Sequence, residues 1–278
     1  MKNESKRDYY LVNGKEIKTS DSSEFESVEA PYVYEVIRVI DGVALFEEGH
    51  IERLKKSIES LGFEMKRDEK QLSEDMKKLI EINKVDCQNI KIIYAGLEAD
   101  EPKVLMFFVE SHYPAKEVYE TGIKTILFQS ERENPNAKVM NTDLRSRVAQ
   151  KFKETGAFEA LLVDDNGYIT EGSRSNFFFI DDGGLYTPPA ETVLLGITRQ
   201  EVIASANDLG IELQEKKLKA EDIGKLEGVF ITGTSNDALP IRYVDDIEIK
   251  TVESPVMQAI MKKYAEKVEN YIKEKKQK

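Results

Sequence analysis

Short clusters of small and hydroxyl-bearing residues carry most of the chemistry that the sequence suggests. One reads EGSRSN at residues 171–176, and another reads GITR at residues 196–199, directly ahead of an apolar helix pattern. A third turn, GTSN at residues 233–236, has a similar composition. Backbone N–H groups, Ser and Thr hydroxyls and the positive end of a helix dipole together bind phosphate groups. These turns therefore predict a site for a phosphorylated cofactor.

Three further polar residues are candidates for the same site, and each has a plain structural alternative. Lys138 stands in a polar loop, where most lysines are simply solvated. Asn141 fits the N-cap position of a helix, and Glu171 could be an ordinary carboxylate at the end of a strand. Composition and spacing alone thus indicate only an α/β protein whose hydroxyl-rich turns bind a phosphate.

The elements that must position these residues follow from hydrophobic periodicity and turn signals. Apolar residues that recur at three and four positions predict helices, and short apolar or alternating runs bounded by Gly, Pro, Asn or Asp predict strands. The predicted helices cover residues 50–62, 69–83, 141–155 and 197–209 and the C-terminal segment from about residue 256. The predicted strands cover residues 33–40, 89–94, 103–110, 122–128, 160–163, 177–180 and 228–232.

The order of these elements predicts two domains. The first third has strands with its helices grouped together, which is an α+β pattern. Residues 111–120 combine a proline with mixed polarity between two strands and read as a crossing segment. We predict a small N-terminal domain at residues 1–113, a crossing at residues 114–120 and a larger cofactor-binding domain at residues 121–278.

Composition excludes several classes of function. The chain has 278 residues, and Lys+Arg 40 against Asp+Glu 52 gives a net charge of −12, which argues against non-specific nucleic-acid binding. The single cysteine, Cys87, allows no intrachain disulfide and no cysteine metal site, and the two histidines, His50 and His112, cannot form a histidine-rich zinc centre. We predict no metal. The start lacks an apolar signal region and no run approaches the roughly 18 apolar residues of a membrane helix, so a cytoplasmic location without membrane contact is the default expectation.

Five motifs, taken in order, resemble those of a known family. They are HIERL with Arg53, KVMN with Lys138 and Asn141, EGSRSNFF, LLGITR and GTSNDALPI, and they span roughly residues 30 to 245. In this order and spacing they resemble the class IV aminotransferases, the fold type IV enzymes that depend on pyridoxal 5'-phosphate. That family includes branched-chain aminotransferase, D-amino acid aminotransferase and aminodeoxychorismate lyase. The resemblance implies a two-domain α/β (α+β) fold, whose larger domain has a β-barrel-like sheet with flanking helices.

The resemblance implies a catalytic role for Lys138. This residue would form the Schiff base with the cofactor aldehyde and then move the proton between the substrate α-carbon and the cofactor. A lysine can do this because its amine is nucleophilic when neutral, and neighbouring positive charge or desolvation favours that form. Glu171 would face the pyridine nitrogen and keep it protonated, so that the ring accepts electrons from the substrate.

The remaining implied residues would hold the phosphate and the ring. The Arg53 guanidinium would bind the phosphate through charge-assisted hydrogen bonds from two of its N–H groups. The N–H groups of Ile197 and Thr198, with the Thr198 hydroxyl, would bind it at a helix start, and Thr234 would add a hydroxyl. Leu194 would pack on the ring face. Ser175 and Asn176 would shape the turn behind Glu171, although Leu194, Ser175 and Asn176 have structural explanations of equal weight.

The substrate side matches the family less closely. Tyr34 and Arg38 correspond to family positions that face the substrate, and Arg38 could instead be structural. The D-amino acid enzymes carry an arginine and a histidine where this chain reads YAGLEADEPK, and the branched-chain enzymes carry a tyrosine where it has Thr142 or Asp143. His112, on the crossing segment, is either at the mouth of the site or a surface residue.

The leading hypothesis is therefore a transaminase that exchanges an amino group between an amino acid, branched-chain-like or other, and a 2-oxo acid. The alternatives are a D-amino acid aminotransferase, a lyase of the aminodeoxychorismate type and a non-catalytic phosphate or nucleotide binder. The presence of both Lys138 and Glu171 argues against a pure binder. The resemblance also implies a homodimer.

Overall fold

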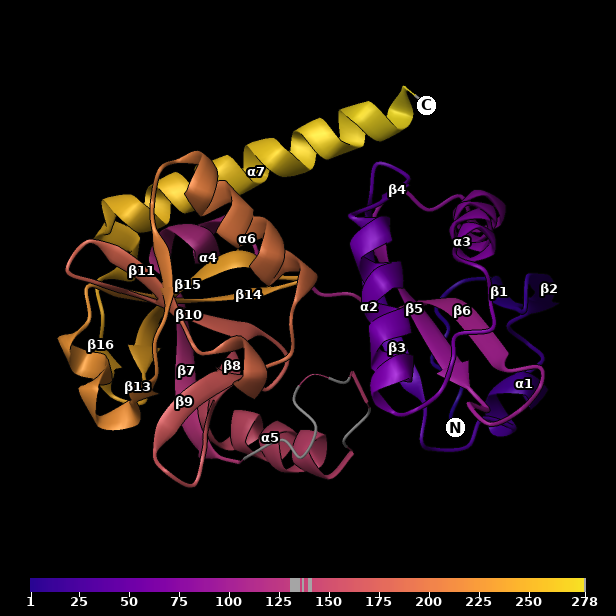
Figure 1. The fold of residues 1–278 in the computed structure, drawn as a ribbon, viewed down its shortest axis with the longest axis horizontal. Coiled ribbons are helices and arrows are strands. Elements are labelled where there is room, and N and C mark those ends of the chain that lie inside the picture. The colour runs from indigo at the N-terminus through magenta and orange to yellow at the C-terminus, as the bar shows by residue number, and fades with distance from the viewer. Residues whose placement is uncertain (131–135, 137, 140–141, 278) are drawn as a thin grey trace. The chain divides into compact units, whose positions relative to one another are not determined.

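A computed structural model describes residues 1–130, 136, 138–139 and 142–277 of the chain. It separates into two compact units (Figure 1). Unit 1 comprises Met1–His112, Ala137–Met140 and Val268–Lys278, and unit 2 comprises Tyr113–Asn136 and Asn141–Lys267. The border between His112 and Tyr113 falls beside the predicted crossing segment. Lys138, however, groups with unit 1 rather than with the segments that follow it in sequence.

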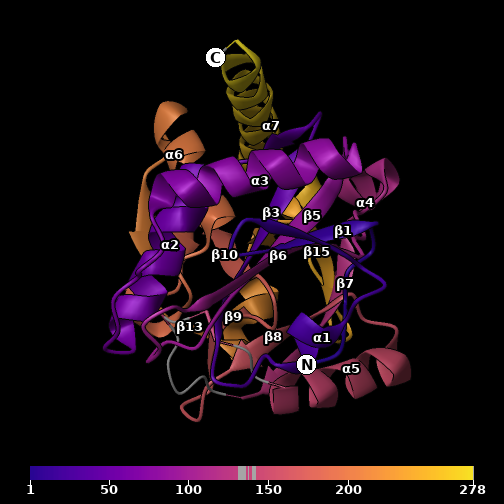
Figure 2. The ribbon, with the colours of Figure 1, turned by 90° about the vertical axis from the view of Figure 1, so that its right-hand side faces the viewer.

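Unit 1 is built on an antiparallel sheet with two helices packed on it. Its six strands follow the order β2-β1-β6-β5-β3-β4. The elements are β1 (Tyr9–Val12), β2 (Lys15–Lys18), α1 (Ser23–Glu26), β3 (Val33–Ile40), β4 (Val43–Ala44), α2 (Glu47–Ser60), α3 (Glu69–Asn83), β5 (Gln88–Ala95) and β6 (Lys103–Val109). Figure 2 shows α2 and α3 lying across the strands, and both contribute to one hydrophobic cluster on the same face.

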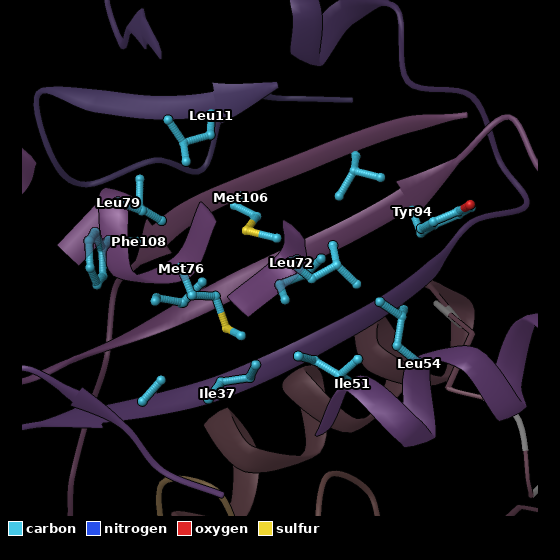
Figure 3. Close-up of a cluster of buried hydrophobic side chains, with 14 of the residues drawn as sticks. Leu11, Ile37, Ile51, Leu54, Leu72, Met76, Leu79, Tyr94, Met106 and Phe108 are labelled. Carbon is cyan, nitrogen blue, oxygen red and sulfur yellow. The ribbon is translucent and has the colours of Figure 1, made fainter. Parts of the chain in front are cut away.

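Alternation along β3 decides what each face of this sheet carries. Val33, Ile37 and Val39 are fully buried on the face that α2 and α3 cover. Side chains from both helices and from neighbouring strands point toward one another there (Figure 3). Each fully buried leucine or isoleucine contributes roughly 1.5–3 kcal/mol, so this cluster holds the helices against the sheet. The residues between, including Tyr34, point to the opposite face, where they pack in a second cluster with Tyr10 and Phe107.

Helix α2 begins three residues before the predicted start at residue 50, and the reason is tertiary. The residue ahead of it, Phe46, has a left-handed φ of 51° and provides no side-chain cap. Instead, the Tyr271 hydroxyl accepts a hydrogen bond from the Glu47 N–H at 3.2 Å, and it donates to the Glu48 carboxylate at 2.7 Å. The hydroxyl comes from more than 200 positions along the chain, so local sequence holds no sign of it.

Unit 2 is organised around a closed ring of six strands. Its strands pair in the order β10-β14-β15-β7-β8-β9, and a further pairing of Asn176 with Glu171 joins β9 back to β10. The ring strands are β7 (Ile123–Gln129), β8 (Glu159–Val163), β9 (Tyr168–Gly172), β10 (Asn176–Asp181), β14 (Gly228–Gly233) and β15 (Asp237–Val244). The expected barrel-like sheet is thus present. Phe177, Phe179 and Ile231 belong to the cluster of buried residues inside it.

Helices and short strands complete unit 2. The helices are α4 (Lys116–Thr121), α5 (Thr142–Thr155), α6 (Ile197–Asp208) and α7 (Pro255–Lys276), with short 3-10 turns at Ala190–Thr192, Ala220–Lys225 and Thr251–Glu253. Of α7, the residues from Val268 onward group with unit 1. The outer strands are β11 (Gly184–Thr187), β12 (Leu213–Glu215), β13 (Leu218–Lys219) and β16 (Ile247–Glu248). The predicted crossing segment contains all of α4 except Thr121, and the periodicity did not indicate this helix. Within the described residues, no helix has the length and apolar character that crossing a membrane requires.

Candidate active site

In unit 1 the predicted phosphate ligand Arg53 is held by a buried carboxylate. Helix α2 places His50 and Arg53 three residues apart, so both face Glu35 on β3. The Arg53 guanidinium donates through Nε to Glu35 Oε1 at 2.7 Å and through Nη2 to Oε2 at 2.6 Å. His50 Nδ1 lies 2.8 Å from the same Oε2. All three side chains are buried, and Glu35 is 0% exposed.

Charge and burial set the protonation of this group. Burial opposes ionisation of Glu35, but the Arg53 and Lys138 charges and the hydrogen bonds from Arg53 and His50 outweigh it and hold the Glu35 pKa well below its usual range. Burial, with the Arg53 and Lys138 charges, lowers the pKa of His50 to about 4. His50 is therefore neutral near pH 7. Its Nδ1 lies closer to the Glu35 carboxylate than to Arg53 Nη2, which is 3.5 Å away. Nδ1 therefore carries the proton and donates a hydrogen bond to the carboxylate.

Lys138 is attached to the same part of unit 1 through its main chain. Its carbonyl accepts the Tyr34 N–H at 3.2 Å, and its own N–H donates to the Ser57 hydroxyl of α2 at 3.4 Å. Val139 forms a bridge with Val33, so the segment runs beside the start of β3. The Lys138 charge lowers the pKa of both Glu35 and His50, so it acts on the same buried group as Arg53 does.

The predicted substrate residues lie on the other face of β3. Tyr34 and Arg38 alternate with Glu35 and Ile37, so they point away from α2. The Lys138 Nζ stands 5.5 Å from the Tyr34 ring centroid, within range of a cation–π contact. Lys91 of β5 also approaches this ring at 5.8 Å, and its ammonium pairs with the Glu4 carboxylate at 2.6 Å.

In unit 2 Glu171 and Asn176 hold the backbone of Leu194 from two sides. The Glu171 carboxylate accepts the Leu194 N–H at 3.2 Å, and the Asn176 amide donates to the Leu194 carbonyl at 2.6 Å. Glu171 is 2% exposed and Asn176 is 5% exposed. Because these two residues also pair across β9 and β10, the place where the ring closes is the place that fixes Leu194.

Several features of the start of α6 would suit an anion. Its N-cap is Gly196, which provides no side chain to bond the first-turn N–H groups, and the first turn has no acidic residue. A Cβ on Gly196 would come within 2.0 Å of the Asn176 side-chain oxygen, so only glycine fits there. Ile197 and Thr198 follow in the first turn and are both buried. A helix start in this state attracts negative charge through its N–H groups and its dipole.

One hydroxyl-bearing residue of β14 lies near this helix start, and another lies in the turn that follows β14. Thr232 pairs with Asn176 and points to the outer face of the ring, where α6 packs on β14. Its hydroxyl is buried without a hydrogen-bond partner among the residues that the structure describes. Thr234 lies in the β14–β15 turn, and a Cβ on the preceding Gly233 would sit 3.8 Å from Ser175, so this turn adjoins the EGSRSN turn. An orphaned buried hydroxyl beside an open helix start fits a phosphate-bearing ligand.

The structure therefore groups the predicted residues in two sets, each inside its own unit. Arg53, Lys138, Tyr34 and Arg38 gather in unit 1, whereas the other set is in unit 2 and comprises Glu171, Asn176, Leu194, Ile197, Thr198 and Thr234. His112 is exposed, with its Nε2 3.6 Å from the Glu110 carboxylate. Asn141 and its predicted capping role lie outside the described residues.

Sequence reasoning missed several residues of these sets. Glu35, His50 and Ser57 surround Arg53 and Lys138, and Thr232 adjoins Asn176. Each of the first two residues had a signal in the sequence. Glu35 interrupts an otherwise apolar alternation on the inner face of β3, and His50 stands one helical turn before Arg53. Thr232 had no such signal, since a threonine in a buried strand is ordinary.

Comparison with known proteins identifies the family to which this fold belongs. The family model described as amino-transferase class IV matches residues 32–244, which is more than half of the chain. The chain is 30% identical over 269 residues to a branched-chain-amino-acid aminotransferase of Escherichia coli, covering 88% of this chain and 87% of that protein. It is also 28% identical over 256 residues to a D-alanine aminotransferase of Bacillus licheniformis, covering 85% of this chain and 90% of that one.

Solved structures have the same architecture. A branched-chain amino acid aminotransferase from T.th., determined with pyridoxamine 5'-phosphate, superposes with a TM-score of 0.83 at 26% identity and covers 96% of each chain. The enzyme of this name from Escherichia coli gives a TM-score of 0.80 at 26% identity, covering 92% of this chain and 93% of that chain. The chain belongs to the class IV aminotransferase family. It is an enzyme of the aminotransferase type, and the fold class predicted from its motifs is confirmed.

Proposed function

We propose that the chain is a pyridoxal 5'-phosphate-dependent aminotransferase that exchanges an amino group between an amino acid and a 2-oxo acid, with Lys138 as its catalytic residue. The observation that carries this proposal is the setting of Lys138. A lysine fixed by its main chain to β3 and α2 stands in the electrostatic field of a buried Arg53–Glu35 pair. A loop lysine that served only solubility would need neither attachment.

The remaining residues receive roles from their local chemistry. The bound cofactor supplies an aldehyde that links to an amine and a ring that accepts electrons. The N–H groups of Ile197 and Thr198 and the Thr234 hydroxyl bind its phosphate, and Arg53 adds a positive charge that Glu35 keeps in a fixed orientation. The Glu171 carboxylate holds the proton of the ring nitrogen.

Lys138 has two tasks in this proposal. Its Nζ would hold the cofactor through the aldehyde that the cofactor supplies, and its neutral amine would carry the proton between the substrate α-carbon and the cofactor. Tyr34 limits where that amine can move, because the Lys138 Nζ rests over its ring. Tyr34 and Arg38 line the side that receives the amino acid and the 2-oxo acid.

The amino acid itself is proposed to be branched-chain-like, because named branched-chain enzymes are prominent among the similar proteins and solved structures. One named relative keeps a D-amino acid specificity open as the second candidate. A panel of L- and D-amino acids separates the two. Loss of the visible band with L-leucine or L-valine supports the first, and loss with D-alanine alone supports the second. Release of pyruvate without a 2-oxo acid acceptor would instead indicate the lyase.

The catalytic lysine is tested by mapping. The purified protein should turn yellow with pyridoxal 5'-phosphate, and borohydride should bleach it and leave the cofactor covalently attached to the peptide that contains Lys138. The Lys138→Ala variant should stay colourless, whereas Lys116→Ala, a change at an exposed lysine of α4, should behave as wild type. A wild-type protein that remains colourless would refute the cofactor, and attachment at another lysine would refute the assignment of Lys138.

The proposal includes a homodimer, which the relatedness to class IV aminotransferases supports. Light scattering on purified protein at micromolar concentration should give twice the mass of the 31.7 kDa chain. A single-chain mass across that range would contradict it.

A further inference from the structure

Unit 2 holds a buried carboxylate that the roles above do not use. Glu159 is the first residue of β8 and is 0% exposed, and the rest of that strand, Ala160–Val163, is apolar and buried. Removing a carboxylate from water is unfavourable unless several donors surround it, so an apolar residue would serve stability better at this position. The presence of Glu159 therefore calls for a local explanation.

Three uncharged donors converge on this carboxylate. Its Oε1 accepts the Ala160 N–H at 2.9 Å and the Ser173 hydroxyl at 2.5 Å, and its Oε2 accepts the Ser175 hydroxyl at 3.1 Å. Both serines belong to the turn that joins β9 to β10. The Ser173 N–H also donates to the Ala160 carbonyl at 2.8 Å, so the backbone of the turn lies on the start of β8 as well.

The turn is pressed tightly against Glu159. The Gly172 N–H donates to the Ser175 carbonyl at 2.8 Å and closes the turn. A Cβ on Gly172 would lie 2.0 Å from the Ser175 hydroxyl and 3.2 Å from the Cγ of Glu159. Any side chain at residue 172 would push the turn off the carboxylate.

The two ends of this turn are Glu171 and Asn176, which pair with each other and hold Leu194. A shift of the turn would change both of these contacts, and with them the segment that leads into α6. We propose that Glu159 is a positioning residue that holds the 172–175 turn through Ser173 and Ser175, so that Glu171 and Asn176 keep their orientation toward the cofactor. The proposal rests on the proposed function, since Glu171 is assigned there to the cofactor ring.

The first test needs no cofactor. Hydrogen exchange of the apo-protein, read by mass spectrometry in peptides spanning residues 169–178, should be at least about tenfold faster in Glu159→Ala than in wild type, because hydrogen bonds to a charged group are lost. Glu159→Gln should show a smaller increase in the exchange rate, because a serine hydroxyl of the turn can rotate and accept a hydrogen bond from the glutamine side-chain amide. Glu154→Ala, at an exposed position of α5, is the matched control and should leave these peptides unchanged.

The second test links the turn to the cofactor. Glu159→Ala and the double variant Ser173→Ala/Ser175→Ala should each bind pyridoxal 5'-phosphate at least about tenfold more weakly than wild type in an absorbance titration. The double variant keeps the carboxylate in place, so it tests the proposal even if Glu159→Ala does not fold. The proposal would be overturned if the variants had wild-type circular dichroism and if both their hydrogen-exchange rates in these peptides and their affinities for the cofactor stayed within about threefold of wild type. A wild-type protein that does not bind the cofactor would refute the proposed function alone, because the exchange test of the turn would still stand.

Discussion

Replacement of Glu35 by alanine should destabilise unit 1 strongly, and the structure sets the scale. Glu35 is fully buried and provides both acceptor oxygens for the Arg53 fork, at 2.7 and 2.6 Å. Removing one partner of a buried, hydrogen-bonded ion pair costs about 3–5 kcal/mol, because the remaining charge stays buried without its counter-charge. The Lys138 charge, which also acts on Glu35, would then add repulsion to Arg53.

A matched control lies on the same helix. Glu52 of α2 pairs with Lys56 at 2.7 Å, but both side chains are more than 60% exposed. Exposed pairs four residues apart on a helix contribute only about 0.3–0.5 kcal/mol. Glu52→Ala should therefore leave stability almost unchanged, although the distance between its partners resembles that in the buried pair.

Hydrogen exchange in β3 and α2 is the assay, because it measures unit 1 without requiring the whole chain to unfold in one step. The slowest amides of α2 should lose about 3–5 kcal/mol of protection in Glu35→Ala and about 1–3 kcal/mol in Glu35→Gln, which retains one acceptor. A loss below about 1 kcal/mol in Glu35→Ala, or one no larger than in Glu52→Ala, would refute the reasoning. If Arg53 binds the phosphate, added pyridoxal 5'-phosphate should restore part of the loss.

Three other perturbations follow from the same contacts. The pKa of His50 falls from 6.5 to about 4 on folding, so its contribution to stability is complete above pH 6.5 and is lost as the pH falls toward 4, because only the unfolded chain takes up the proton. The free energy of unfolding should decline by roughly 2–3 kcal/mol over this pH range, and His50→Gln should remove the decline. Gly196→Ala should weaken cofactor binding at least about tenfold by titration, since the added Cβ would lie 2.0 Å from the Asn176 side-chain oxygen and would displace that amide. Unchanged affinity would contradict the geometry. Tyr271→Phe should lower the protection of the first turn of α2 by about 1 kcal/mol in hydrogen exchange, because both the Glu47 N–H and the Glu48 carboxylate lose their hydrogen bond to the hydroxyl. Protection equal to that of wild type would show that the hydroxyl does not cap the helix.

The sequence indicated those features of the candidate site whose chemistry is local. The glycine and hydroxyl turn ahead of α6 follows from residues adjacent in the chain, since a helix start needs only its own N–H groups and a small residue before it. The order and spacing of five motifs then identified the family. Residues held by partners on other elements were not predicted, including Glu35 and Glu159, because a single acidic residue in an apolar strand does not say which donors will meet it.

The sequence by itself determined the periodic elements and the family, because hydrophobic spacing and turn residues act over a few neighbouring positions. Helix α3 was predicted with its observed bounds, Glu69–Asn83, since its apolar face and its Asp68 cap are local. Only the tertiary structure decided where α2 begins, which unit holds Lys138, and how the ring closes at Glu171 and Asn176. Those outcomes depend on hydrogen bonds and ion pairs between segments that meet only when the chain packs, and their partners cannot be read from either segment alone.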